Sequence, residues 1–212
     1  MNNILQYITP NRKKFESDPF GYSASARNKW ELIKGINGFS ENLTKSATSE
    51  ELKNPILWMT QAEALTQAAI IIIKKEPKFE NMPINLRGIC DSQFCATGLM
   101  LVGYSLEICL KAMIIIKKGI DCYCAEEKKY SHHKLNQLAD FIPNLNEKDI
   151  AILKILSHYV YWAERYPDPG FGKLDKLEEV FNLAEGHKIT LKKLIDLAGR
   201  IMAFTKKVVE ET

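Results

Sequence analysis

The chain has 212 residues, of which 46% are hydrophobic and 26% charged, and it carries a formal net charge of +3 at pH 7. This composition is typical of a globular protein and excludes an intrinsically disordered one, and the length suits one domain with a sizeable core. The small positive charge allows an acidic partner such as nucleic acid but does not demand one, because binders concentrate their charge on one face.

Two observations bear on where the protein works. Its five cysteines are odd in number, one of them (Cys109) lies in an apolar run, and Met1–Pro10 does not read as a secretory signal. The run Phe94–Ile116 is long enough to cross a bilayer, but it contains Glu107 and Lys111, each of which costs a few kcal/mol in hydrocarbon. We therefore expect a cytoplasmic protein with no membrane span.

The first 50 residues alternate short apolar groups with breakers such as SDPFGYS and GINGFSEN. This pattern predicts an irregular or partly helical N-terminal extension over 1–50, with a helix around Ala26–Lys34. Residues 51–212 are more regular and form the predicted main domain.

The main domain opens with two long helices. Asn54 is a typical N-cap before Pro55, and apolar residues then recur at helical spacing until Pro77 ends the element. A second helix is predicted from Leu86 to Lys118, with Gly119 as its C-terminal cap. Its apolar residues surround it almost completely, which places it at the centre of a bundle.

Four further helices follow from caps and breakers, and no convincing period-two strand or internal repeat is present. The predicted class is all-α, an antiparallel helical bundle with short connections. The predicted helices run from the cap Ser131 to just before Pro143, from Glu147 (capped by Asn146) to about Arg165, from Lys173 to Glu185, and from Thr190 to about Glu210.

Glu107 and Lys111 are spaced i to i+4 on the central helix, in the order that lets their charges meet. One interpretation is a partly exposed ion pair worth a few tenths of a kcal/mol. The other is that so apolar a helix tolerates two charges only where they belong to a polar stripe that lines a cleft or an interface. The polar residues of this helix fall near one narrow stripe: Thr97, Tyr104, Glu107, Lys111 and Lys118.

Histidines and an arginine supply the other candidate positions. His132 and His133 follow Cys122 and Cys124, but a single intervening residue is a poor spacing for two zinc-binding cysteines, so no metal is expected. The pair can instead cap backbone donors where the third helix opens.

His158 and Arg165 lie seven residues apart, on nearly the same face of the fourth predicted helix. His158 suits a hydrogen-bonded position at the edge of the core. Arg165 suits either the negative end of the helix dipole or, with Tyr166 and a rigid proline turn behind it, a phosphate. No phosphate-binding glycine loop, zinc-protease motif, kinase signature or nucleophile elbow is present.

Four stretches in order resemble the HEPN superfamily of small helical-bundle domains: WMTQAEALTQAA, GYSLEICLKAMIIIKKG, HKLNQLADF and YVYWAERYPDPG. The similarity covers roughly Asn54 to Glu211. It implies an antiparallel bundle that forms a homodimer and works on or near RNA or nucleotides, often beside a nucleotidyltransferase in toxin–antitoxin and defence systems. Glu107, Lys111, His133 and Arg165 would then be the family's polar positions, and no cofactor is implied.

Ribonuclease members of that family use an arginine followed four to six residues later by a histidine. Here no histidine follows Arg165 until His187, and no other arginine has one at that spacing. We therefore expect a dimeric binding module without catalysis, whose candidate ligand-binding residues are Glu107, Lys111, His133, His158, Arg165 and Tyr166. The alternatives are a divergent metal-independent endoribonuclease toxin, with an imidazole supplied by His158 or His133, and a purely structural protein-interaction subunit.

Overall fold

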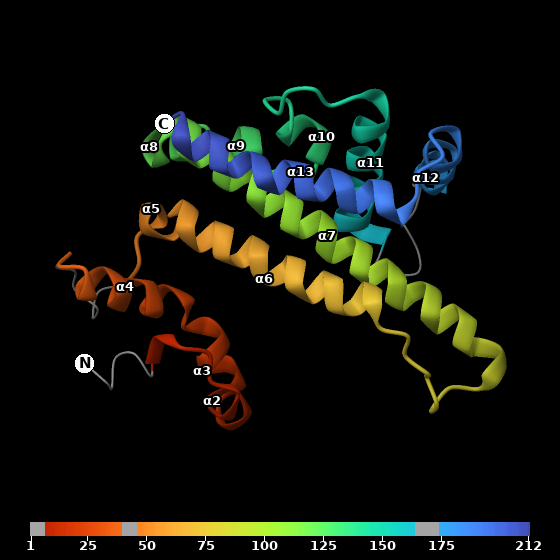
Figure 1. Cartoon of the computed structure of the whole chain (residues 1–212), viewed down its shortest axis with the longest axis horizontal. Helices are drawn as coiled ribbons and strands as arrows, with labels where there is room; N and C mark the ends of the chain where they lie inside the picture. The colour runs from red at the N-terminus through yellow and green to blue at the C-terminus, as the bar shows by residue number, and fades with distance from the viewer. Residues whose placement is uncertain (1–6, 40–45, 164–173) are drawn as a thin grey trace. The chain divides into compact units, whose positions relative to one another are not determined.

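A computed structural model describes residues 7–39, 46–163 and 174–212 (Figure 1). Within these ranges the regular structure is helical and no strand occurs, so the predicted all-α class is confirmed. The chain divides into two compact units, Met1–Leu57 and Trp58–Thr212.

Within its described residues, the first unit includes the helices α2 (Arg12–Ser17), α3 (Pro19–Ala24), α4 (Ala26–Ile36) and α5 (Ser49–Leu52). The helix expected near Ala26 is α4, but the rest of this unit is more helical than its breakers suggested. Three of the helices have their own side-chain cap, because Asn11, Asp18 and Thr48 each accept a hydrogen bond from a backbone N–H three residues on.

Helix α6 (Pro55–Lys74) crosses the boundary between the units, and the second unit holds the remaining elements. These are η1 (Ile84–Leu86), α7 (Arg87–Lys118), α8 (Ile120–Ala125), α9 (Glu127–Tyr130), α10 (Leu135–Leu138), α11 (Glu147–His158), the π-helical turn η2 (Tyr159–Ala163), α12 (Leu174–Gly186) and α13 (Leu191–Glu210).

The ends of the long helices match the predicted caps. Asn54 accepts the N–H of Ile56 at the start of α6, and Gly119 ends α7 with a φ of 81°, a left-handed value that suits glycine. Asn146 forms a capping box with Asp149 at the start of α11.

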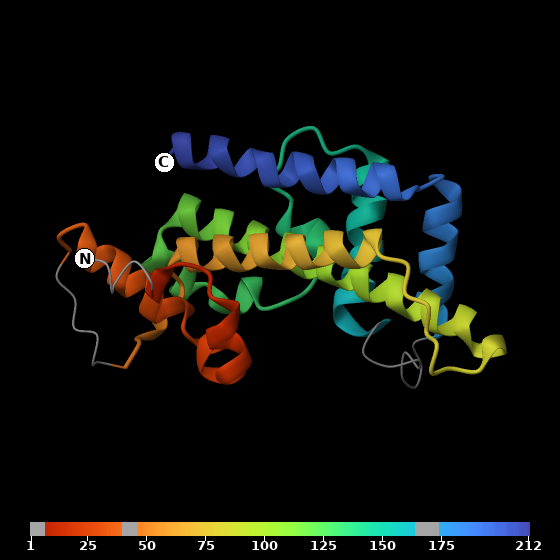
Figure 2. The ribbon, with the colours of Figure 1, turned by 60° about the horizontal axis from the view of Figure 1, so that its bottom comes forward.

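Helix α7 is the centre of the second unit, as its apolar wrapping predicted. Most of its residues from Gly98 to Ile115 are buried, and Leu106, Leu110 and Met113 are completely inaccessible. Helix α13 runs along one side of α7, and α10, α11 and η2 pack against another (Figures 1 and 2). Helix α6 is joined to α7 by a hydrogen bond between Thr66 Oγ1 and Ser105 Oγ (2.6 Å).

Three predicted boundaries differ from the structure. The helix expected from Ser131 to Pro143 is only the four-residue α10, and Ser131 does not cap it. The stretch before it, expected as a connection, forms α8 and α9. The helix expected to reach Arg165 is α-helical only to His158 and continues as η2, and residues 164–173, which include Arg165, lie outside the described ranges.

Two described stretches are long and apolar enough to cross a membrane by length and composition alone, Ser49–Lys74 and Ile84–Lys118. In the second, 61% of the most apolar window is buried inside the protein, whereas in the first the share is 11%. Burial of this kind is what the core helix of a bundle requires, so the second stretch is explained by its central position.

Gly103 lies at a close crossing of α7 with α11 and η2. A Cβ atom at this position would lie 2.5 Å from Val160 Cγ2 and 3.2 Å from the carbonyl oxygen of Leu156. We expect Gly103→Ala to force these helices apart and to lower the free energy of unfolding by about 2 kcal/mol, which lowers Tm by about 4–8 °C in a chain of this size. Thermal denaturation followed by circular dichroism measures the change.

Gly199→Ala is the matched control, because this glycine also lies inside a long helix but a Cβ there meets no atom within 4 Å. Removing a helical glycine without a clash should raise stability by about 1 kcal/mol. Equal effects of the two substitutions would contradict the close crossing at Gly103.

Candidate functional site

The polar stripe of α7 contains a buried ion pair. Lys111 Nζ lies 2.8 Å from Glu107 Oε1, and the two residues are only 9% and 5% exposed. Of the two interpretations drawn from the sequence, the partly exposed pair is therefore wrong. A buried carboxylate loses several kcal/mol of hydration, so it needs hydrogen bonds on both of its oxygens.

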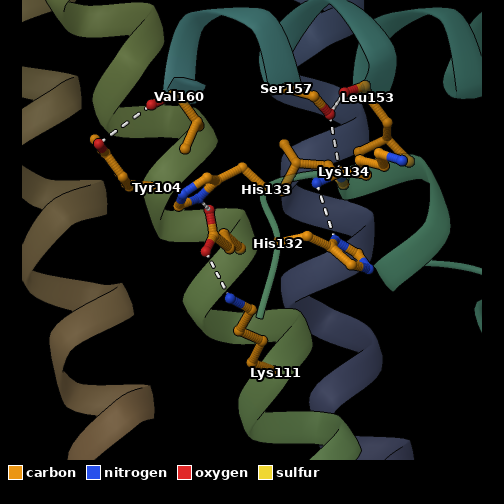
Figure 3. Close-up of polar contacts among 10 residues, drawn as sticks. Tyr104, Lys111, His132, His133, Lys134, Leu153, Ser157 and Val160 are labelled. Atoms are coloured by element: carbon orange, nitrogen blue, oxygen red, sulfur yellow. Dashed lines mark hydrogen bonds and ion pairs between the residues drawn. The ribbon is translucent and has the colours of Figure 1, made fainter. Parts of the chain in front are cut away.

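His133 supplies the bond to the second oxygen. It lies in the turn before α10, and its Nδ1 is 2.8 Å from Glu107 Oε2 (Figure 3). An ionised carboxylate can only accept hydrogen bonds, so Nδ1 of His133 carries the ring proton and donates this hydrogen bond. In the neutral ring the lone pair then belongs to Nε2, and the side chain is 41% exposed. Tyr161 of η2 lies beside the imidazole, with ring centroids 6.2 Å apart.

The turn that carries His133 is held by polar contacts rather than by a long helix. His132 Nδ1 accepts the backbone N–H of Lys134 (3.2 Å), and the N–H of Leu135 donates to Ser157 Oγ on α11 (2.9 Å). Ser157 in turn donates to the carbonyl of Leu153 (2.7 Å; Figure 3). Burial and the nearby Lys111 ammonium lower the pKa of His132, which agrees with a neutral ring that accepts through Nδ1.

His132, His133 and Ser157 border a cavity of about 640 Å³ between this turn, α11 and α12. We call it the histidine cavity and define it by six of its lining residues: His132, His133, His158, Lys134, Lys154 and Glu179. Across it from His133, His158 Nε2 lies 3.5 Å from Glu179 Oε2. The cavity is therefore lined by two imidazoles, each of which faces a carboxylate, and by two exposed lysines.

Of the candidate residues from the sequence, the structure brings Glu107, Lys111 and His133 into direct contact and places His158 in the same cavity. Arg165 and Tyr166 lie outside the described residues. His132 accepts a backbone N–H, as expected. That N–H belongs to Lys134, which directly precedes the short helix α10, because the longer helix expected from Ser131 does not form.

Sequence reasoning missed several lining residues. Lys154 could have been found, because it precedes His158 by four residues on α11 and so shares its face. Lys134 directly follows His133 and Tyr161 lies in the stretch YVYWAERYPDPG, but neither residue belongs to a spacing pattern that indicates a site. Glu179 comes from α12, and no local pattern relates it to His158.

The arrangement suits two kinds of chemistry. Lysines and imidazole N–H groups can hold an anion such as phosphate, and an imidazole whose far nitrogen is fixed by a carboxylate can accept a proton. Across the three described ranges, no group of three or more histidine, cysteine, aspartate or glutamate side chains is placed to hold a metal ion.

No known protein family, curated protein or solved structure matches the chain significantly.

Substitution of Glu107 tests how much depends on the buried carboxylate. Glu107→Gln leaves Lys111 buried without a counter-charge, so we expect a loss of roughly 3 kcal/mol in the free energy of unfolding, measured by urea denaturation. Adding Lys111→Met should recover part of that loss, because the unpaired charge is then removed.

Glu210→Gln is the control, since Glu210 and Lys206 form an i,i+4 pair (3.8 Å) with side chains 62% and 85% exposed. Its effect should stay below about 0.5 kcal/mol. A Glu107→Gln variant as stable as Glu210→Gln would show that the buried pair is not needed for folding.

Proposed function

We propose that the chain is a HEPN-like helical module that binds a nucleotide or single-stranded RNA in the histidine cavity. The observation that carries this proposal is the buried Glu107, which accepts from both Lys111 and His133 and so holds an imidazole at the wall of a cavity lined by two further histidines and two lysines. The resemblance of the same residues to HEPN motifs supports it.

The size and charge of the cavity suit such a ligand. Its volume of about 640 Å³ falls in the range of small-molecule sites. Lys134 and Lys154 are exposed cations that can pair with phosphate oxygens. Tyr161 is 53% exposed at the same cavity and offers an aromatic face on which a base can stack.

The proposal includes the setting that the resemblance implies. The protein acts in the cytoplasm as a homodimer, beside a nucleotidyltransferase or an antitoxin, in a toxin–antitoxin or defence system. Light scattering during gel filtration measures the dimer directly, and purification of the chain with its genomic neighbours identifies the partner.

Binding is measured by the fluorescence anisotropy of a labelled single-stranded RNA, with adenosine monophosphate as competitor. We expect Lys154→Ala to weaken RNA binding and to reduce the slope of log K against log salt concentration by about 0.7, the contribution of one phosphate contact on a single strand.

Lys192→Ala is the matched control, since Lys192 is an exposed lysine on α13 that does not line the cavity. It should leave affinity and salt slope close to those of the unmodified protein. Failure of both RNA and the mononucleotide to bind at low salt would favour the alternative of a purely structural protein-interaction subunit.

A further inference from the structure

We infer that the first unit binds a small phosphate monoester in a pocket that shares no lining residue with the histidine cavity. This pocket has a volume of about 320 Å³, which falls in the range of small-molecule sites. We call it the tyrosine pocket and define it by five of its lining residues: Tyr7, Lys14, Tyr22, Ser25 and Lys29. It lies outside the stretch that resembles the HEPN superfamily, so the inference does not depend on the proposed function.

Two lysines from different helices converge on the tyrosine pocket. Lys14 belongs to α2 and Lys29 to α4, and among the described contacts neither pairs with a carboxylate. Lys14 Nζ lies instead 5.1 Å from the ring centroid of Tyr7, and Lys29 Nζ lies 4.1 Å from that of Tyr22. Two like charges at one pocket repel each other, so an anion that lies between them is favoured.

Tyr22 adds a hydrogen-bond donor to the two cations. Its hydroxyl oxygen accepts the backbone N–H of Asn11 (3.1 Å), and among the described contacts the hydroxyl proton has no acceptor. The same bond ties the start of α2 to α3 and so fixes the ring that Lys29 covers. The pocket therefore offers a ligand two ammonium groups and one phenol O–H on a positioned ring.

The segment around the pocket also favours anions. Residues 7–29 contain five lysines and arginines and two acidic residues, a formal charge of +3. Of the two acids only Asp18 lines the pocket, and its Oδ1 already accepts the N–H of Gly21 as the cap of α3 (2.9 Å). Ser25 donates its hydroxyl to the carbonyl of Tyr22 (2.6 Å), so α4 has no side-chain cap and its positive end adds to the potential of the lysines.

The number of donors and the size of the pocket favour a phosphate monoester over other anions. Such a group carries a charge of about −1.5 to −2 at pH 7 and three strong acceptor oxygens, whereas a carboxylate carries one charge. Two ammonium groups and a hydroxyl donor match the phosphate. The pocket is larger than a phosphate group, and the rings of Tyr7 and Tyr22 border the remaining space, so an aromatic substituent on the phosphate can pack there.

The test uses the full chain and isothermal titration calorimetry with phenyl phosphate, benzoate and phenol. We expect one phenyl phosphate to bind per chain, benzoate to bind at least about tenfold more weakly, and phenol not to bind. Lys14→Gln and Lys29→Gln should each weaken the binding of phenyl phosphate by about tenfold, the loss expected for one hydrogen bond to a charged group.

Lys13→Gln is the matched control, because Lys13 precedes Lys14 on α2, is exposed and does not line the pocket. It removes the same charge from the same helix, so its effect on affinity should stay below about twofold, which is the screened contribution of a distant exposed charge. Circular dichroism establishes that each variant is folded.

Amide chemical shifts locate the ligand without any substitution. On saturation with phenyl phosphate, the amides of Gly21 and Ser25 should shift, and those of Lys134 and Lys154 at the histidine cavity should not. The reverse pattern overturns the inference and supports the proposed function instead. Absence of phenyl phosphate binding at low salt, equal affinity for benzoate or phenol, or unchanged affinity in both folded lysine variants also overturns the inference.

Discussion

Glu107 is a charged residue at the centre of a helical bundle, and the contacts around it stabilise its carboxylate. A carboxylate 5% exposed needs donors on both oxygens, and these come from Lys111, one turn on, and from His133, 26 residues further along the chain. The second bond ties the turn before α10 to α7. That tie sets the ring orientation of His133 and so forms one wall of the histidine cavity.

The long helices could be predicted because the signals that define them are local. Asn54, Gly119, Asn146 and Thr190 each mark an end of a long helix, and apolar periodicity fills the spans between. The short helix α10 could not be predicted in the same way. Its first amide is capped by Ser157 of α11, so its start depends on a tertiary contact, and the pattern before it resembled an ordinary N-terminus.

The candidate site was predictable only in part, for the same reason. Two charges in an apolar run indicated that Glu107 and Lys111 had a special environment, and their spacing predicted that they meet. Nothing local connects His133 to Glu107 or Glu179 to His158, since each contact joins separate elements. Sequence reasoning could therefore name Glu107, Lys111, His133 and His158 without showing how they are brought together.

The contacts that hold the turn of His133 also bear on the order in which the protein folds. The bonds from His133 to Glu107 and from Leu135 to Ser157 close loops of 26 and 22 residues, whereas the contact of Cys109 with Thr205 on α13 spans 96. Closing the longer loop costs about 1 kcal/mol more chain entropy. By loop-closure entropy alone, the polar contacts within the segment from α7 to α11 therefore form at a lower cost than the contact that ties α13 to α7.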